Sequence, residues 1–517
     1  LRQWVYGGQT LLALTMIPLG VAAALFAIGI WFTVPRDVRA LRARRQGVRR
    51  RGPELLPDAA TFNARVRGHR WFGDKGIGIQ IGGGTVTRLN LRGGIRLPPG
   101  AQYRHLAVFG SPGAGKSSLF RQLLLQIRQR GERAVVWDAA MEFTRELYDE
   151  SHGDEIVTPN DIRSPYWALG DEITTEFDAD TLAEAFFPHQ HRSNEFFTHG
   201  PRQICAYLLR FKPSASQLRT WLSDEKELDR LLDEYAEGRS IAHIVSRRSG
   251  PQRAGVLASL NMIAKSLALI PDEADTTHRW STAAWATKRT GWLFISSTPM
   301  TRARLTPLLS AWIDLLILRT MTRPDQRGRH QPPAVWFMLD EFASLQRLQQ
   351  AQTALAEGRK SRNPIVLGLQ SRSQLDASYG QLADSMIACT GTQVYFRTPE
   401  PNTAEWVSKA FGQIEAERVR ESWSEGRGRI GRPQRTESLD RGFEPLVMAS
   451  QISGLPNMHG LLKFNDVALP IQIPYVELRA VAPDFVPRPD SPLLVTPPAP
   501  SPVDPGDAPN LDWEWVS

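Results

Sequence analysis

The sequence predicts an α/β protein with a parallel sheet, an inserted all-α domain, an N-terminal transmembrane helix and a disordered C-terminal tail. Three observations carry this prediction. Residues 110–117 read GSPGAGKS, which matches the phosphate-loop pattern G-x-x-x-x-G-K-[ST] between an apolar run, Leu106–Phe109, and a helical pattern, Ser118–Arg128. Strand-like and helical segments alternate again after residue 285. Residues 11–34 form an uncharged stretch long enough to cross a membrane.

The N-terminal region predicts a membrane anchor. As a helix, residues 11–34 would be ~36 Å long, against about 30 Å of hydrocarbon core. Eight arginines and one aspartate follow within residues 35–52. Because the charges follow the apolar stretch, they favour an anchor over a secretory signal peptide, with the remaining chain cytoplasmic. We interpret residues 1–10 as a periplasmic lead, truncated because the chain begins at Leu1. The basic juxtamembrane segment, residues 35–60, is expected to contact anionic membrane lipids; DNA contact is its alternative.

Net charge and cysteine content further narrow the class of protein that the sequence can encode. Most of the net charge of +8 comes from the arginine run, so the rest of the chain gives only weak evidence for a DNA-binding surface. The two cysteines, Cys205 and Cys389, lie in separate segments. They predict a reducing compartment and exclude a disulfide framework or a cysteine-based metal site.

The elements divide the chain into regions. We predict a nucleotide-binding domain in two parts, residues 61–177 and 285–483, interrupted by an all-α domain at 178–284. The predicted strands are Leu106–Phe109, Ala134–Trp137, Trp292–Ile295, Val335–Leu339, Ile365–Leu369 and Gln393–Phe396. The predicted helices beside them are Ser118–Arg128, Leu308–Thr320, Leu345–Lys360, Gln381–Ala388 and Thr403–Phe411. Such alternation predicts a parallel sheet covered on both faces.

The inserted region and the C-terminal end break this alternation. In the insertion, Leu228, Leu231, Leu232 and Tyr235 follow the spacing of one helical face. Residues 484–517 contain nine prolines and a net charge of −5, which predicts a Pro-rich acidic, disordered tail. Its acidic and aromatic end fits either a partner-binding motif or a solvated tail. The arginine-dense segment Arg418–Arg435 is expected to be an exposed loop.

The glycine-rich loop predicts ATP and Mg²⁺ as cofactors. Its cofactor-binding residues are Gly110, Ser111, Pro112, Gly113, Ala114, Gly115, Lys116 and Ser117. We expect positive φ at the three glycines, so that backbone N–H groups approach phosphate oxygens beside the N-terminal end of the next helix. Lys116 would reach the β- and γ-phosphates, and the Ser117 hydroxyl would coordinate Mg²⁺.

Polar residues at the ends of two later strands complete the predicted catalytic set. Asp340 and Glu341 follow the apolar run Val335–Leu339. Asp340 would support Mg²⁺, and Glu341 would act as a general base on the attacking water. Gln370 ends the strand Ile365–Leu369 and is expected at the same sheet edge, where it would sense the γ-phosphate or orient water. An ordinary polar strand end is the alternative for Gln370.

Five segments together resemble the type IV secretion coupling proteins of the TraD/TrwB conjugation group, and within it the F-type TraD proteins. They are GSPGAGKS, GWLFISS (291–297), VWFMLDEFASL (335–345), EGRK (357–360) and GLQSRSQLDASYG (368–380). The resemblance covers roughly residues 90–480. It implies a RecA-like motor domain in a membrane-anchored homo-hexameric ATPase, located in the bacterial inner membrane with its bulk in the cytoplasm.

The resemblance also implies residue roles. Arg359, in EGRK, occupies the place of the family's arginine finger, which reaches the nucleotide of the neighbouring subunit; Arg362 is the competing candidate. Gln370 matches the family's glutamine after the third motor strand. The run Asp138–Phe143 departs from the family because it lacks a glycine. Asp138 and Glu142 are compatible with the family roles, but the loop geometry is open.

The function implied is ATP-driven conjugative DNA transfer. The expected partners are single-stranded transfer DNA, relaxase or relaxosome proteins, and inner-membrane components of a type IV secretion system. One alternative is a double-strand DNA translocase of the FtsK kind, which should carry a C-terminal winged-helix module. The other is a nucleotide-gated substrate receptor without motor activity.

Overall fold

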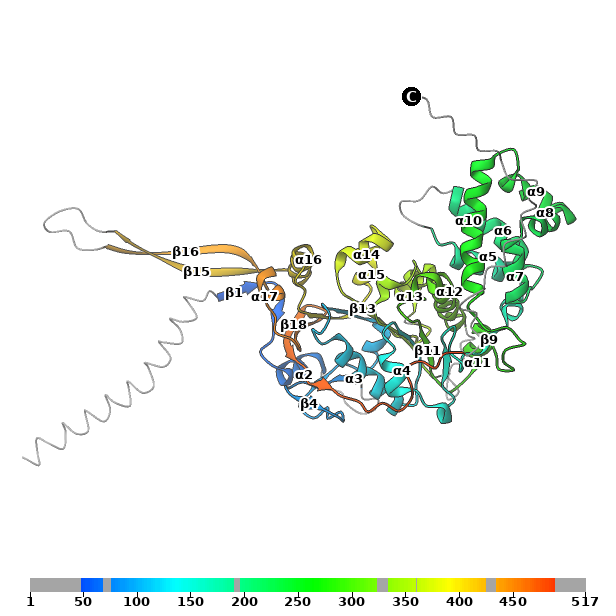
Figure 1. Ribbon diagram of the computed structural model, residues 1–517. Helices are drawn as coiled ribbons and strands as arrows, with labels where there is room; N and C mark the ends of the chain where they lie inside the picture. The colour runs from blue at the N-terminus through cyan, green and yellow to red at the C-terminus, as the bar shows by residue number, and fades with distance from the viewer. Residues whose placement is uncertain are drawn as a thin grey trace, which may run out of the picture. The chain divides into compact units, whose positions relative to one another are not determined.

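The structure, a computed structural model, resolves into two compact units (Figure 1). It describes residues 48–67, 76–189, 196–322, 333–358, 360–424 and 434–488. Unit 1 comprises the chain up to Leu125 together with Gly368–Ala377 and Gln381–Glu477. Unit 2 comprises Gln126–Leu367, Ser378–Gly380 and the chain from Leu478. The predicted membrane helix, residues 11–34, lies outside the described residues. Among the helices that the structure describes, none is both long and apolar enough to span a bilayer.

Unit 1 contains a mixed sheet. Its strands, in spatial order, are β2 (Glu54–Leu55), β18 (Val467–Gln472), β17 (His459–Phe464), β14 (Thr392–Phe396) and β6 (Leu106–Phe109). Strands β14 and β6 run parallel, as predicted, whereas β17 runs antiparallel to both of its neighbours. The sheet is therefore mixed and not purely parallel. The antiparallel hairpin β17–β18, which the sequence did not predict, pairs with it beside β14.

Shorter elements complete unit 1. They are α2 (Ala59–Arg67), β3 (Gly78–Ile79), β4 (Thr85–Val86), β5 (Ile95–Arg96), α15 (Leu382–Ala388), α16 (Pro401–Phe411), α17 (Ala449–Ser453) and β19 (Tyr475–Val476). A second sheet pairs β1 (Val48–Arg51), β15 (Gln413–Ser424) and β16 (Gln434–Pro445). The long β15–β16 hairpin extends away from the rest of unit 1 (Figure 1). The segment Arg418–Arg435, expected to be a loop, is thus strand wherever the structure describes it.

Unit 2 contains the parallel sheet that the sequence predicted. Its strands are β8 (Glu155–Val157), β11 (Leu293–Ser296), β7 (Arg133–Asp138), β12 (Val335–Leu339) and β13 (Ile365–Leu369). All the pairings of these strands are parallel. Every residue in them is buried, as expected for a sheet covered on both faces. The boundary between the units falls inside β13, after Leu367.

Most of the stretch between β8 and β11 is helical, and Figure 1 shows helices α5 to α10 gathered together. These are α5 (Glu176–Phe186), α6 (Phe196–Leu209), α7 (Ala215–Ser223), α8 (Glu225–Glu234), α9 (Ala236–Ile241) and α10 (Gly250–Leu267). Leu228, Leu231 and Leu232 are buried on α8, as their spacing predicts. Tyr235 is not part of that helical stripe, because it follows the last residue of α8 in an extended conformation and is 50% exposed.

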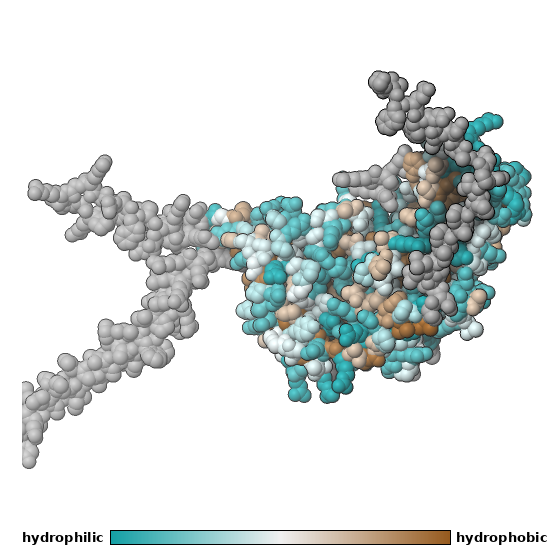
Figure 2. All heavy atoms as spheres, in the orientation of Figure 1, coloured by the Kyte–Doolittle hydropathy of each residue, from teal (hydrophilic) through white to brown (hydrophobic). Residues whose placement is uncertain are grey.

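The remaining elements of unit 2 surround its sheet. They are α4 (Glu142–Leu147), β9 (Tyr166–Trp167), β10 (Arg279–Trp280), α11 (Thr282–Thr287), α12 (Arg302–Met321) and α13 (Gln349–Glu357). Two helices cross the unit boundary: α3 (Lys116–Gln129) and α14 (Arg372–Tyr379). Hydrophilic residues cover most of the face shown in Figure 2, with hydrophobic residues in smaller areas between them.

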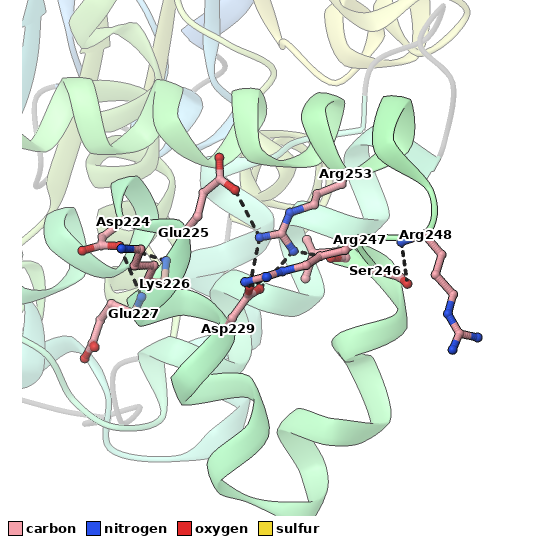
Figure 3. Close-up of polar contacts among 10 residues, drawn as sticks. Asp224, Glu225, Lys226, Glu227, Asp229, Ser246, Arg247, Arg248 and Arg253 are labelled. Carbon is pink, nitrogen blue, oxygen red and sulfur yellow. Dashed lines mark hydrogen bonds and ion pairs between the residues drawn. The ribbon is translucent and has the colours of Figure 1, made fainter.

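A charged cluster ties α10 to α8 (Figure 3). The buried guanidinium of Arg253 donates to both carboxylate oxygens of Asp229, at 3.0 and 3.2 Å, and to Glu225 at 3.2 Å. Arg247 also donates to Asp229, at 2.8 Å. Burial alone would raise the pKa of Asp229, but the bonds from Arg253 and Arg247 outweigh it and hold that pKa below its usual value.

The first residues of the predicted tail are ordered against unit 2. Val486 donates to the Asp161 carboxylate at 3.1 Å and accepts from Ile162 at 2.9 Å, and Pro487 forms a bridge with Asp161. Residues 484–488 are therefore not part of a disordered tail, because the buried Asp161 supplies partners that composition cannot reveal. Residues 489–517 lie outside the described residues.

Candidate nucleotide site

The glycine-rich loop joins the end of β6 to the start of α3, as the motif requires. Three backbone hydrogen bonds within unit 1 hold it: Gly110 N to Leu369 O at 3.0 Å, Ser111 N to Arg397 O at 2.9 Å, and Met458 N to Ala114 O at 2.9 Å. Helix α3 begins at Lys116, so the N–H groups of its first turn lie at the loop. These groups have no carbonyl acceptor within the helix itself. This is the arrangement that makes a helix N-terminus attractive to phosphate.

Two of the three loop glycines adopt the expected backbone conformation. Gly113 has φ 70° and Gly115 has φ 130°, in the region that favours glycine. The expectation of positive φ at Gly110 was wrong. Gly110 is needed for space instead, because a Cβ there would lie 2.9 Å from the Cβ of Phe396.

The loop residues fit a phosphate group. A Cβ at Gly113 would meet no described atom within 4 Å, so the loop backbone there faces open space. The buried Oγ of Ser111 has no hydrogen-bond partner among the described residues. Lys116 is 7% exposed, and its ammonium donates to the carbonyl of Gly110 at 2.6 Å, which places a positive charge over the loop. Ser117, the next residue, is half-buried at the first turn of α3.

The two candidate carboxylates lie in unit 2, at the carboxyl end of the fully buried β12. Asp340 and Glu341 are both half-buried. Glu341 has φ 55° and ψ 45°, a left-handed conformation that costs a non-glycine residue about 1–3 kcal/mol and is common at functional sites. A turn holds it, because Ser344 N donates to the Glu341 carbonyl at 2.8 Å and Ser344 Oγ accepts from Trp137 at 3.2 Å.

Asp138 belongs to the same electrostatic environment as Asp340. It ends β7, is 1% exposed, and accepts from the backbone N of Thr144 at 2.7 Å and from its hydroxyl at 2.9 Å. Burial, opposed by the Thr144 bonds and helped by the charges of Asp340 and Glu142, raises the pKa of Asp138 to about 7. Two neighbouring strands of unit 2 thus end in acidic groups that influence one another.

The loop after β7 makes its turn without glycine. Met141 takes φ 59°, and its N donates to the Asp138 carbonyl at 3.2 Å. Arg302 braces the same loop through the carbonyl of Ala139 and the hydroxyl of Ser297. The sequence left the geometry of this loop open because the loop lacks a glycine. The structure shows that the loop turns through a left-handed conformation at Met141.

Two residues, Gln370 and Arg359, were given roles by resemblance, and the structure describes only Gln370. Gln370 directly follows β13 and is half-buried, in the short part of unit 1 that also contains the start of α14. Arg359 lies outside the described residues. Its competitor Arg362 has φ 55° and is half-buried.

Three polar side chains that hold the segment after Glu341 were missed by sequence reasoning. Ser310 Oγ accepts from Gln346 N at 2.9 Å. The buried Asp314 accepts from Gln349 N at 3.2 Å and from Gln350 N at 2.8 Å. Tyr379 Oη accepts from Leu348 N at 3.0 Å. Ser310 and Asp314 lie outside the motifs, and a buried Asp in the middle of an apolar helix was the signal available for them. Tyr379 lies in the segment 368–380 but was given no role.

Fold and site together place the chain among α/β proteins built on a strand, a glycine-rich loop and a helix, and unit 2 adds a strand that ends in two acidic residues. The model of the family described as "Type IV secretion-system coupling protein DNA-binding domain" matches residues 90–477. The chain therefore belongs to the type IV secretion-system coupling protein family, and the resemblance found in the sequence is confirmed.

Individual relatives agree with this assignment. The coupling protein TraD of Escherichia coli (strain K12) is 30% identical over 408 residues, which cover 76% of this chain and 56% of TraD. VirD4 of Rhizobium rhizogenes is 28% identical over 126 residues, 24% of this chain and 18% of VirD4. The chain thus spans little more than half the length of this TraD.

Solved structures of the plasmid coupling protein TrwB share the fold. TrwB in complex with the ATP analogue ADPNP has a TM-score of 0.69 at 24% identity, covering 85% of this chain and 98% of TrwB. TrwB in complex with ADP and Mg²⁺ gives the same values. The large mixed α/β fold is therefore shared with TrwB.

Proposed function

We propose that this chain is one subunit of a membrane-anchored hexameric ATPase that brings relaxase-bound DNA to a type IV secretion channel and drives its transfer. The observation that carries the proposal is the family match over residues 90–477, and the positive φ of Gly113 and Gly115 in the glycine-rich loop supports it. The nucleotide and Mg²⁺ bound by TrwB support ATP and Mg²⁺ as the cofactors here.

Each half of the proposed site has a separate task. The loop residues 110–117 bind the phosphates, with Lys116 contacting the β- and γ-phosphates. Ser117 and Asp340 hold Mg²⁺, because hydroxyl and carboxylate oxygens are its preferred ligands. Glu341 accepts a proton from the attacking water, and Gln370 orients that water or senses the γ-phosphate. Mg²⁺, when bound, neutralises charge that develops on the phosphates. That the two halves form one site is part of the proposal.

In the proposed hexamer, a neighbouring subunit completes the nucleotide site. An arginine supplied by a neighbouring subunit can stabilise the charge of phosphoryl transfer, a role that we assign to Arg359. Hydrolysis then depends on ring formation. The DNA strand is held sequence-tolerantly through its phosphates, so binding should weaken steeply as salt rises. The proposed anchor, residues 11–34, places the ring at the inner membrane, with the arginine-rich segment beside anionic lipids and secretion components nearby.

The test is Glu341→Gln in a donor cell that depends on this protein for plasmid transfer. A carboxamide cannot accept the proton, so ATP hydrolysis and transfer should both fall at least about 100-fold. Glu405→Gln, an exposed glutamate on α16, is the matched control and should transfer normally. Transfer that persists without hydrolysis would contradict a motor and favour a nucleotide-gated receptor.

A further inference from the structure

We propose that Tyr379 is a positioning residue that couples helix α14, which follows Gln370, to the turn that holds Glu341. The inference rests on the proposed function, because it assigns a role in hydrolysis. It concerns Tyr379, which lies in the segment 368–380 but was given no role from the sequence.

Tyr379 holds both ends of the segment that follows Glu341. Its ring stacks on Phe342, the residue directly after Glu341, with centroids 5.4 Å apart and planes 15° apart. Its hydroxyl accepts from the backbone N of Leu348 at 3.0 Å. Tyr379 is 3% exposed and Leu348 is 1% exposed, so water cannot replace the hydroxyl as acceptor without opening the packing.

The other supports of this segment come from a different element. Ser310 and Asp314, both on α12, accept from the backbone of residues 346, 349 and 350. These bonds fix the segment against a helix of unit 2. Tyr379 differs from them because α14, on which it lies, begins two residues after Gln370.

Helix α14 links Gln370 to the Glu341 turn through Tyr379 and Phe342. It runs from Arg372 to Tyr379, and the chain passes from unit 1 to unit 2 within it, after Ala377. A short continuous helix moves as one piece, because each turn is hydrogen bonded to the next. A displacement of Gln370 on γ-phosphate contact would therefore be carried to Tyr379, and through it to the left-handed turn at Glu341.

Tyr379→Phe tests the hydroxyl alone, since the ring and its stacking on Phe342 remain. Tyr207→Phe is the matched control: Tyr207 is 5% exposed, and its hydroxyl makes one 3.0 Å bond to the Leu231 carbonyl in the helical region. Both variants lose one buried hydroxyl bond and should lose similar thermal stability. We expect the kcat for ATP hydrolysis to fall about ten-fold in Tyr379→Phe with KM within about two-fold, and to stay near wild type in Tyr207→Phe.

A double-mutant cycle with Gln370→Ala separates coupling from a merely structural role. If α14 links the two residues, Tyr379→Phe should cost little further kcat once Gln370 is removed. Tyr207→Phe should act independently of Gln370. Equal kcat values for Tyr379→Phe and Tyr207→Phe, or fully multiplicative effects with Gln370→Ala, would overturn the inference while wild-type hydrolysis stands. Absence of hydrolysis in the wild type would overturn the proposed function and this inference with it.

Discussion

At the scale of single residues, the backbone conformation carries as much information as the motifs. The loop glycines divide into two kinds: Gly113 and Gly115 supply positive φ, whereas Gly110 supplies space beside Phe396. Glu341 takes the left-handed conformation without being glycine. Such strain is retained where the surroundings fix it, and here the Glu341 carbonyl accepts from Ser344 N while the Ser344 hydroxyl accepts from Trp137.

Lys116 gives the first prediction at this scale. Lys116→Ala should abolish measurable binding of a fluorescent ATP analogue, because the loop then lacks its only lysine ammonium. Lys116→Arg should also bind poorly, since a planar guanidinium does not fit the space that the ammonium takes beside Gly110. Lys409→Ala, at an exposed position of α16, is the control. Normal affinity in Lys116→Ala would remove the loop from the nucleotide site.

Asp314 gives a prediction on pH. Burial, opposed by the backbone bonds from Gln350 and Gln349 and helped by the charge of Glu184, raises its pKa from 3.8 to about 7. Between about pH 4 and 7 the folded protein thus binds a proton at Asp314 that the unfolded chain has lost. Its contribution therefore makes the free energy of unfolding fall as pH rises through that window. Asp314→Asn should flatten this fall in urea unfolding measured at pH 5 and pH 7; an unchanged slope would show that Asp314 does not titrate there.

At the scale of elements, the sequence predicts buried strands best. Val335–Leu339 and Ile365–Leu369 form strands over the predicted residues. Short apolar runs bounded by polar residues are typical of parallel strands that are buried on both faces. Helix starts that depend on distant partners were not predictable. Helix α13 was expected from Leu345 but begins at Gln349, where Asp314 of α12 accepts from its first N–H groups.

The same reasoning explains what was missed at the site. Asp340, Glu341 and the loop were predictable because their chemistry requires those residue types at fixed places along the chain. Tyr379, Ser310 and Asp314 act through backbone groups, which every residue carries, so no spacing reveals them. The antiparallel strands β17 and β18 also escaped prediction, since the pattern favoured continued alternation of strand and helix.

The charged cluster between α8 and α10 gives the prediction at this scale. Arg253→Ala should destabilise the protein by roughly 3 kcal/mol, because it leaves the partly buried Asp229 without its bidentate partner. Arg230→Ala removes an arginine from exposed ion pairs on the same helix α8 and should change stability little. Chemical denaturation of both variants is the measurement. Equal stabilities would mean that the cluster is solvated and contributes nothing specific.

At the scale of the whole molecule, the proposed function requires a nucleotide site, a ring and a membrane anchor. Outside the arginine run the chain is close to neutral, so DNA contact in a ring requires its basic residues to concentrate along the channel. The family match covers residues 90–477, which include the glycine-rich loop and the acidic end of β12.

The central claim is that the loop and the acidic strand end form one ATP site whose hydrolysis DNA controls. The most direct measurement is ATP hydrolysis by the full chain, with and without single-stranded DNA, read together with oligomer size. We predict hydrolysis that rises with DNA, accompanies ring formation, and is lost in both Lys116→Ala and Glu341→Gln. Hydrolysis that is indifferent to DNA and oligomer size, or that survives in Glu341→Gln, would contradict the account.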